Sequence, residues 1–238
     1  MILAAMLIPV FQQARAQARK SSCINQMRQF GQAIVSYRGD TEELMPRWMS
    51  SLYPDYMPST DVYVCPQDPS AGFDGGRHGL GFGNGNDSLA DVSFSEGDEY
   101  GDPSIPGLDL KDIFAETDDT SRNPARVGEG ANLEIERSSY MYEFADVQCS
   151  WLPTSNMDWY DIKPEQLRQG LGRNGAQDFT NFLNGIDDDL EAWEPYQFPM
   201  IRCFQHMGVL WGKREMAINS AYSGEFFYSK YEWEKTFQ

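Results

Sequence analysis

Cysteine and histidine are the residues of this chain best suited to form covalent cross-links or to bind a metal ion. The four cysteines are Cys23, Cys65, Cys149 and Cys203, and the two histidines are His78 and His206. In an oxidising compartment four cysteines predict two disulfides, with three possible pairings. Closing the shorter loops favours Cys23–Cys65 and Cys149–Cys203. The alternative is a zinc site of Cys65, Cys149, Cys203 and His206, although no paired Cys-x-x-Cys spacing supports it.

Acidic residues gather in two segments that could supply the hard oxygen ligands that Ca²⁺ prefers. The first set is Asp87, Asp91, Glu96, Asp98 and Asp102, and the second is Asp187, Asp188 and Asp189. Neither set follows the EF-hand pattern. The alternative is a solvated acidic surface, which is what a run of charge usually means.

Signs of catalysis are missing from the sequence. It contains no Gly-x-Ser-x-Gly elbow and no His-Glu-x-x-His motif. The glycine-rich run at 72–85 lacks the Gly-Lys-Ser/Thr of a phosphate-binding loop. No residue pattern marks a nucleophile with its base. We therefore expect a protein that is not an enzyme.

The first 38 residues predict one long helix, which must position the cysteine that it carries. They are rich in Ala, Gln, Arg and Met, and from Cys23 to Tyr37 apolar residues recur at spacings of three and four. A helix of this length without caps is typical of a coiled coil, a membrane span or an assembly element. The apolar start, Met1–Phe11, is shorter than the about 20 residues that span a membrane, so it also fits a core helix segment.

Charge is divided unevenly along the chain. The first 38 residues carry five basic and no acidic side chains, so the net charge of −17 leaves −22 on the remainder. Such an acidic body argues against nucleic-acid binding, because the phosphates would be repelled. An apolar end, a basic collar and an acidic body are the layout of a membrane-anchored subunit. The alternative is a helix whose end is buried in its own domain.

Two segments resemble the type IV pilin-like family, which includes the pseudopilins of type II secretion systems. The first, Ile-Leu-Ala-Ala-Met-Leu-Ile-Pro-Val-Phe-Gln-Gln-Ala-Arg at 2–15, is similar to the second half of the family's N-terminal signature, and the similarity continues through 22–33. The second, at 62–69, contains a Cys-Pro-x-Asp element seen in large pseudopilin-like proteins. The leader, the processing Gly and the Phe and Glu of the family start are not in this sequence, so we expect that the first half of the membrane helix is missing.

The resemblance implies a structural subunit of a type II secretion or type IV pilus-like filament. Its partners would be other pilin-like subunits and the inner membrane, with the globular part in the periplasm or in an extracellular filament. The residues expected in the membrane or filament core are Leu3, Leu7, Ile8, Pro9, Val10 and Phe11, and those expected at the lipid headgroups are Arg15, Arg19 and Lys20. Family members are N-methylated at the processed start, and major pseudopilins hold calcium in a loop, so the resemblance allows Ca²⁺ as a cofactor without requiring one.

The expected fold is α+β, with a long N-terminal helix packed on a small antiparallel sheet. We divide the chain into the helix at 1–38 and a globular domain at 39–238, with an acidic, loop-rich insertion at about 67–134. Short helices are expected at 47–56, 163–169 and 177–193, and strands at 61–65, 138–145, 198–204, 215–221 and 225–228, the last two forming a hairpin.

A second function fits the same sequence. The chain could be a soluble, secreted binding module, dependent on calcium, that oligomerises through its N-terminal helix. Partition with membranes separates the two hypotheses, because the anchored subunit requires it and the soluble module does not.

Overall fold

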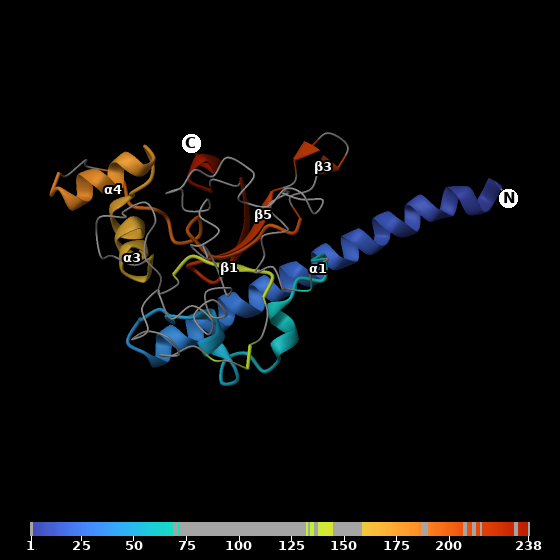
Figure 1. Cartoon of the computed structure of the whole chain (residues 1–238), viewed down its shortest axis with the longest axis horizontal. Helices are drawn as coiled ribbons and strands as arrows, with labels where there is room; N and C mark the ends of the chain where they lie inside the picture. Colours follow the sequence, from blue (N-terminus) through green and yellow to red (C-terminus); the bar gives the residue numbers. More distant parts are fainter. Residues whose placement is uncertain are drawn as a thin grey trace, which may run out of the picture.

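The longest helix that the structure describes, α1, runs from Ile2 to Asp40 (Figure 1). We describe a computed structural model, in which residues 2–68, 71, 132, 134–135, 138–144, 159–186, 190–206, 209–210, 213–214, 216–230 and 233–237 are placed. The expected long helix is thus confirmed. It ends where the Thr41 hydroxyl donates a hydrogen bond of 2.7 Å to the Tyr37 carbonyl and where Glu42 and Glu43 take positive φ.

A four-stranded antiparallel sheet lies against α1, in the strand order β1-β2-β5-β6. Its strands are β1 (Met141–Tyr142), β2 (Pro199–Cys203), β5 (Ala217–Ala221) and β6 (Phe226–Ser229). The β5–β6 hairpin forms where the sequence predicts it. A separate two-stranded hairpin joins β3 (Val209–Leu210) to β4 (Lys213–Arg214). The long helix and the small antiparallel sheet confirm the α+β fold.

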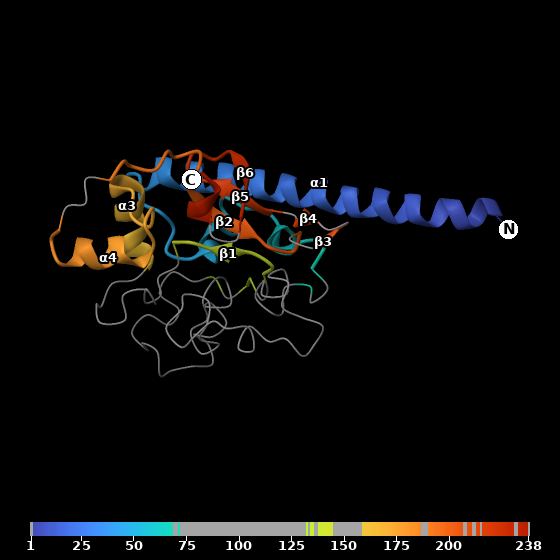
Figure 2. The same cartoon turned by 90° about the horizontal axis from the view of Figure 1, so that it is seen from above.

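The core lies between the sheet and the second half of α1. Met27, Phe30 and Ile34 of α1 are fully buried there, on the stripe that the three-and-four spacing predicts. The Phe30 ring packs edge to face on the Tyr63 and Tyr140 rings, with ring centroids 5.1 and 5.6 Å away. This aromatic packing holds one half of the helix to the body, while the other half extends beyond it (Figures 1 and 2).

Two short helices, α3 (Trp159–Gln169) and α4 (Ala176–Leu183), pack around a second, smaller core. The helix expected at 163–169 begins earlier, at Trp159. The helix expected at 177–193 is too long, because α4 ends at Leu183. Gly185 there takes a φ of 69°, and the Ile186 N–H bonds to the Asn181 carbonyl at 2.9 Å, which satisfies the end of the helix.

Three further expectations differ from the structure. The strand expected at 61–65 is wrong: Thr60–Tyr63 is the short helix η2, whose first turn is capped because the Ser59 hydroxyl accepts the Asp61 N–H at 3.2 Å. Of the strand expected at 138–145, only β1 forms. The Tyr140 N–H donates a hydrogen bond of 3.0 Å to the Ser138 hydroxyl, so this N–H is used locally and not in the sheet. The helix expected at 47–56 is η1 (Met49–Leu52), and a last short helix, η5, spans Trp233–Thr236.

A glycine allows the close approach of α1 to the β5–β6 turn. A Cβ atom at Gly31 would lie 2.4 Å from the Gly224 carbonyl oxygen, whereas a Cβ at Gly39 of the same helix would meet nothing within 4 Å.

We expect Gly31→Ala to lower the free energy of unfolding by about 1–3 kcal/mol through overpacking. Gly39→Ala is expected to leave it unchanged or to raise it by up to about 1 kcal/mol. Urea unfolding measures both, and equal stability of the two variants would contradict this packing.

Candidate metal centre and assembly helix

The first half of α1 is exposed along the part whose side chains the structure describes. Residues 10–22 are all exposed except the half-buried Lys20. The apolar side chains of Val10 and Phe11 are 59% and 69% exposed. The other expected membrane or filament residues, Leu3, Leu7, Ile8 and Pro9, lie on the same helix, but their side chains are outside the described residues. Among the described helices, none is long and apolar enough to cross a membrane.

The basic residues of α1 divide between solvent and the body. Arg15 is exposed. The Arg19 guanidinium donates a hydrogen bond of 3.4 Å to the Gln67 side-chain oxygen. The Lys20 ammonium lies 5.3 Å from the centre of the Tyr228 ring on β6. The three predicted headgroup residues therefore do not form one uniform collar, because two of them contact the globular body.

Three cysteines and a histidine converge at the point where α1 enters the body. Cys23 comes from α1, Cys65 follows η2, Cys203 ends β2, and His206 lies in the turn after β2. The three sulfur atoms and one imidazole nitrogen all lie within 4.8 Å of one another. The cysteines are at most 1% exposed and His206 is 6% exposed. Three segments distant in the sequence thus place their four ligand atoms around one buried point.

The buried thiols of this cluster have opposite pKa shifts. Hydrogen bonds with Cys203 and Cys23, and then with His206, hold the pKa of Cys65 far below its ordinary value. The Cys65 sulfur lies 3.4 Å from the His206 Nε2 atom. Burial, followed by hydrogen bonds to the other two thiols, raises the pKa of Cys203 well above its ordinary value. The four groups therefore interact directly with one another at the centre of the cluster.

The expected disulfides are not seen in the described part of the chain. Cys23, Cys65 and Cys203 are free thiols, so the Cys23–Cys65 bond is not formed and Cys203 is not bonded to a partner. Cys149 lies outside the described residues. The predicted zinc alternative needs one change, because Cys23 takes the place of Cys149 beside Cys65, Cys203 and His206. The signal that could have found Cys23 is its place on the buried stripe of α1, one turn before Met27.

The calcium candidates stay untested. Both predicted sets, at 87–102 and at 187–189, lie outside the described residues.

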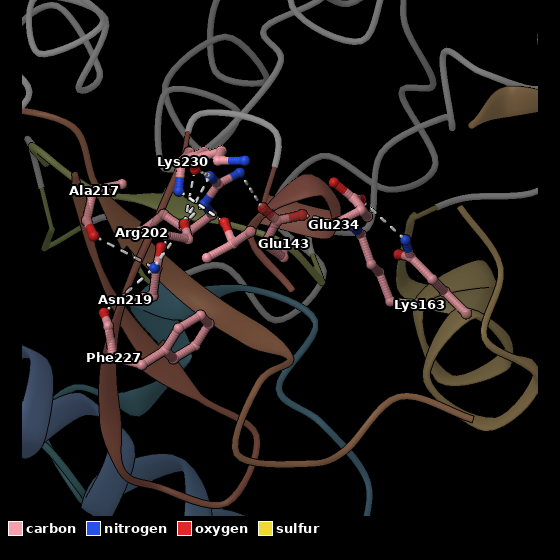
Figure 3. A network of polar contacts seen from close by, with 11 residues as sticks. Glu143, Lys163, Arg202, Ala217, Asn219, Phe227, Lys230 and Glu234 are labelled. Atoms are coloured by element: carbon pink, nitrogen blue, oxygen red, sulfur yellow. Dashed lines mark hydrogen bonds and ion pairs between the residues drawn. The ribbon is translucent and has the colours of Figure 1, made fainter. Parts of the chain in front are cut away.

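A buried charge network, which the sequence analysis missed, joins the sheet to α3 (Figure 3). Glu143 follows β1 and forms ion pairs with Lys163 of α3 at 2.6 Å and with Arg202 of β2 at 3.1 Å, all three side chains being at most 1% exposed. Arg202 also donates to the Asn219 side chain and to the Lys230 carbonyl, both at 3.1 Å. Charged residues are rarely buried in this way without partners, but no pattern in the sequence shows which residues pair.

Two buried carboxylates in this region, those of Glu143 and Glu234, have opposite pKa shifts. For Glu143, desolvation raises the pKa, but the charges of Lys163 and Arg202 outweigh it and the net pKa is lowered. Burial raises the pKa of Glu234, whose carboxylate accepts a hydrogen bond of 3.2 Å from the Gln166 side chain. Glu143 is thus the carboxylate that two cations hold ionised.

Removing the charge of Glu143 should destabilise the fold. We expect Glu143→Gln to lower the free energy of unfolding by about 3–5 kcal/mol, because Lys163 and Arg202 would keep buried charges without their counter-ion. The matched control is Glu165→Gln on α3, whose ion pair with Arg168 is partly exposed and is expected to contribute less than about 1 kcal/mol. Chemical denaturation of both variants measures the difference. A loss below about 1 kcal/mol for Glu143→Gln would contradict the network's role.

The same carboxylate predicts a dependence of stability on pH. Its pKa in the folded state is lower than in the unfolded chain, so its contribution is present above the unfolded value of about 4.3. That contribution is lost as the pH falls through the folded value. We expect the unfolding free energy of the wild type to fall more steeply below about pH 4.3 than that of Glu143→Gln. Parallel curves for the two proteins would count against the shift.

Comparison with known proteins locates one similarity on α1 and the residues that follow it. Residues 12–58 match the profile of the family SBP_bac_10, described as "Protein of unknown function (DUF1559)". The match begins in the exposed half of α1, continues through its packed half and includes η1. It covers less than half of the 238 residues. No curated protein and no solved structure matches the chain.

Proposed function

We propose that this chain is a non-enzymatic structural subunit of the pilin-like type, which assembles through the exposed first half of α1. The observation that carries the proposal is that one half of this helix is buried in the core and the other half is exposed. From Cys23 onward its apolar stripe is built into the core, whereas from Val10 to Ala18 the side chains are all exposed and the helix extends beyond the body (Figure 2).

An exposed helix of this kind has little to stabilise it within its own chain. Tertiary packing of an apolar face supplies most of the stability of helices in proteins. Val10 and Phe11 have no such packing in the isolated subunit, since both are more than half exposed. Burying one large apolar side chain contributes about 1.5–3 kcal/mol. Contact with other helices or with lipid would provide that burial.

The family similarity falls on the same helix. The matched segment at 12–58 contains α1 from Gln12 to its end, so the helix that the proposal assigns to assembly is also the part of the chain that this family shares. In this proposal the partners are the α1 helices of other pilin-like subunits and the membrane. The acidic globular domain would then lie in the periplasm or on the outside of an extracellular filament.

A substitution in the exposed half separates assembly from folding. We expect Phe11→Asp, made in the full-length gene in its native host, to reduce the share of protein in the membrane or filament fraction at least about tenfold, since a loss of about 1.4 kcal/mol has that effect. The free energy of unfolding of the globular part should change by less than about 0.5 kcal/mol.

The matched control is Gln13→Asp, which introduces the same charge at a polar, exposed position two residues on. Residues i and i+2 do not share a helix face, so this variant should fractionate like the wild type. If Phe11→Asp also fractionates like the wild type, the assembly role is wrong. If the wild type itself stays in the soluble fraction, the soluble binding module is the better account.

A further inference from the structure

The buried cluster of Cys23, Cys65, Cys203 and His206 has the ligands of a closed zinc site. Structural zinc sites are four-coordinate and tetrahedral, and three cysteines with one histidine are a common ligand set. With Zn–S of about 2.3 Å and Zn–N of about 2.0–2.1 Å, tetrahedral ligands lie about 3.5 Å apart for sulfur and nitrogen and about 3.8 Å apart for two sulfurs. The Cys65 sulfur and the His206 Nε2 atom are 3.4 Å apart, and no pair of ligand atoms exceeds 4.8 Å.

The surroundings of the cluster are those of a closed metal site. The Gln67 N–H donates to the Cys65 sulfur at 3.4 Å, and outer partners of this kind orient metal ligands. The cluster has no exposed side: its three cysteines are at most 1% and its histidine 6% exposed. Four protein ligands without an open position are typical of a structural zinc site and not of a catalytic one.

We propose that Cys23, Cys65, Cys203 and His206 bind one zinc ion that fixes α1 to the globular body. Zinc binding displaces the protons of the thiols and leaves the imidazole neutral. The ion would connect α1, the segment after η2 and the end of β2. Cys23 is the first fully buried residue of α1 after the exposed stretch at 10–22. The zinc therefore lies where the helix leaves the body and sets the direction in which its exposed half points.

The proposed zinc ion would also link the two ends of the long chain segment between Cys65 and Cys203. Cys65 and Cys203 enclose the acidic insertion at about 67–134 in the sequence. A metal link that closes a long loop contributes stability mainly by restricting the unfolded chain. Metal removal should therefore lower the stability of the whole globular domain.

The test is a titration of the reduced, metal-free full chain with Co²⁺, which reports thiolate ligands by sulfur-to-cobalt charge-transfer absorption. We expect about one Co²⁺ per chain, displaced by Zn²⁺, with a tetrahedral visible spectrum. Zinc content of the protein purified from its native host, without added metal, is measured in parallel. Cys149→Ser is the matched control and should bind Co²⁺ as the wild type does. Cys203→Ser should weaken binding by more than the about 10–100-fold that loss of an outer partner costs.

A second variant guards against a simple folding defect. His206→Cys keeps four ligands and should bind Co²⁺ with stronger charge-transfer absorption, because four thiolates replace three. Three results would overturn the proposal: no charge-transfer band in the wild type, loss of the band in Cys149→Ser, or a disulfide among Cys23, Cys65 and Cys203 in unreduced native protein. The outcome is independent of assembly, because Phe11→Asp leaves all four ligands in place.

Discussion

The packing of the second half of α1 on the sheet is the contact on which the rest of the structure depends. This contact requires glycine at position 31. The Gly31 backbone approaches the Gly224 carbonyl so closely that a Cβ atom on Gly31 would lie 2.4 Å from the carbonyl oxygen. That approach lets Phe30 and Ile34 reach the core. It also places Cys23 beside the end of β2, because Cys23 lies on the same buried stripe two turns earlier. The aromatic core and the thiol cluster are thus consequences of one helix–sheet contact.

Two sets of buried side chains connect further segments to this helix and sheet. The first, the cysteine–histidine cluster, joins α1 to β2. In the second, Glu143 joins β1 and β2 to α3 through Lys163 and Arg202. Both groups tie together segments that are distant in the sequence, and both are buried among apolar side chains: the three cysteines belong to the main core, and Lys163 lies over the Trp159 ring. These buried groups hold together the body on which the second half of α1 packs.

Local signals explain how much of the fold the sequence could predict. The apolar stripe predicted α1, and the turn at 222–224 predicted the β5–β6 hairpin, because both depend on residues near one another in the chain. The strand expected at 61–65 failed because the Ser59 cap and the burial of Tyr63 outweigh β propensity there. The cluster was only partly predictable: the spacing of Cys203 and His206 was visible, but Cys23 joins them only through tertiary packing.

The most direct measurement is photo-cross-linking in the native host, with a photoreactive amino acid in place of Phe11 and mass spectrometry of the products. The account predicts cross-links from this position to the α1 helices of neighbouring pilin-like subunits or to membrane lipid, because the side chain is 69% exposed in the isolated subunit. A chain recovered only as an uncross-linked, soluble monomer would contradict it.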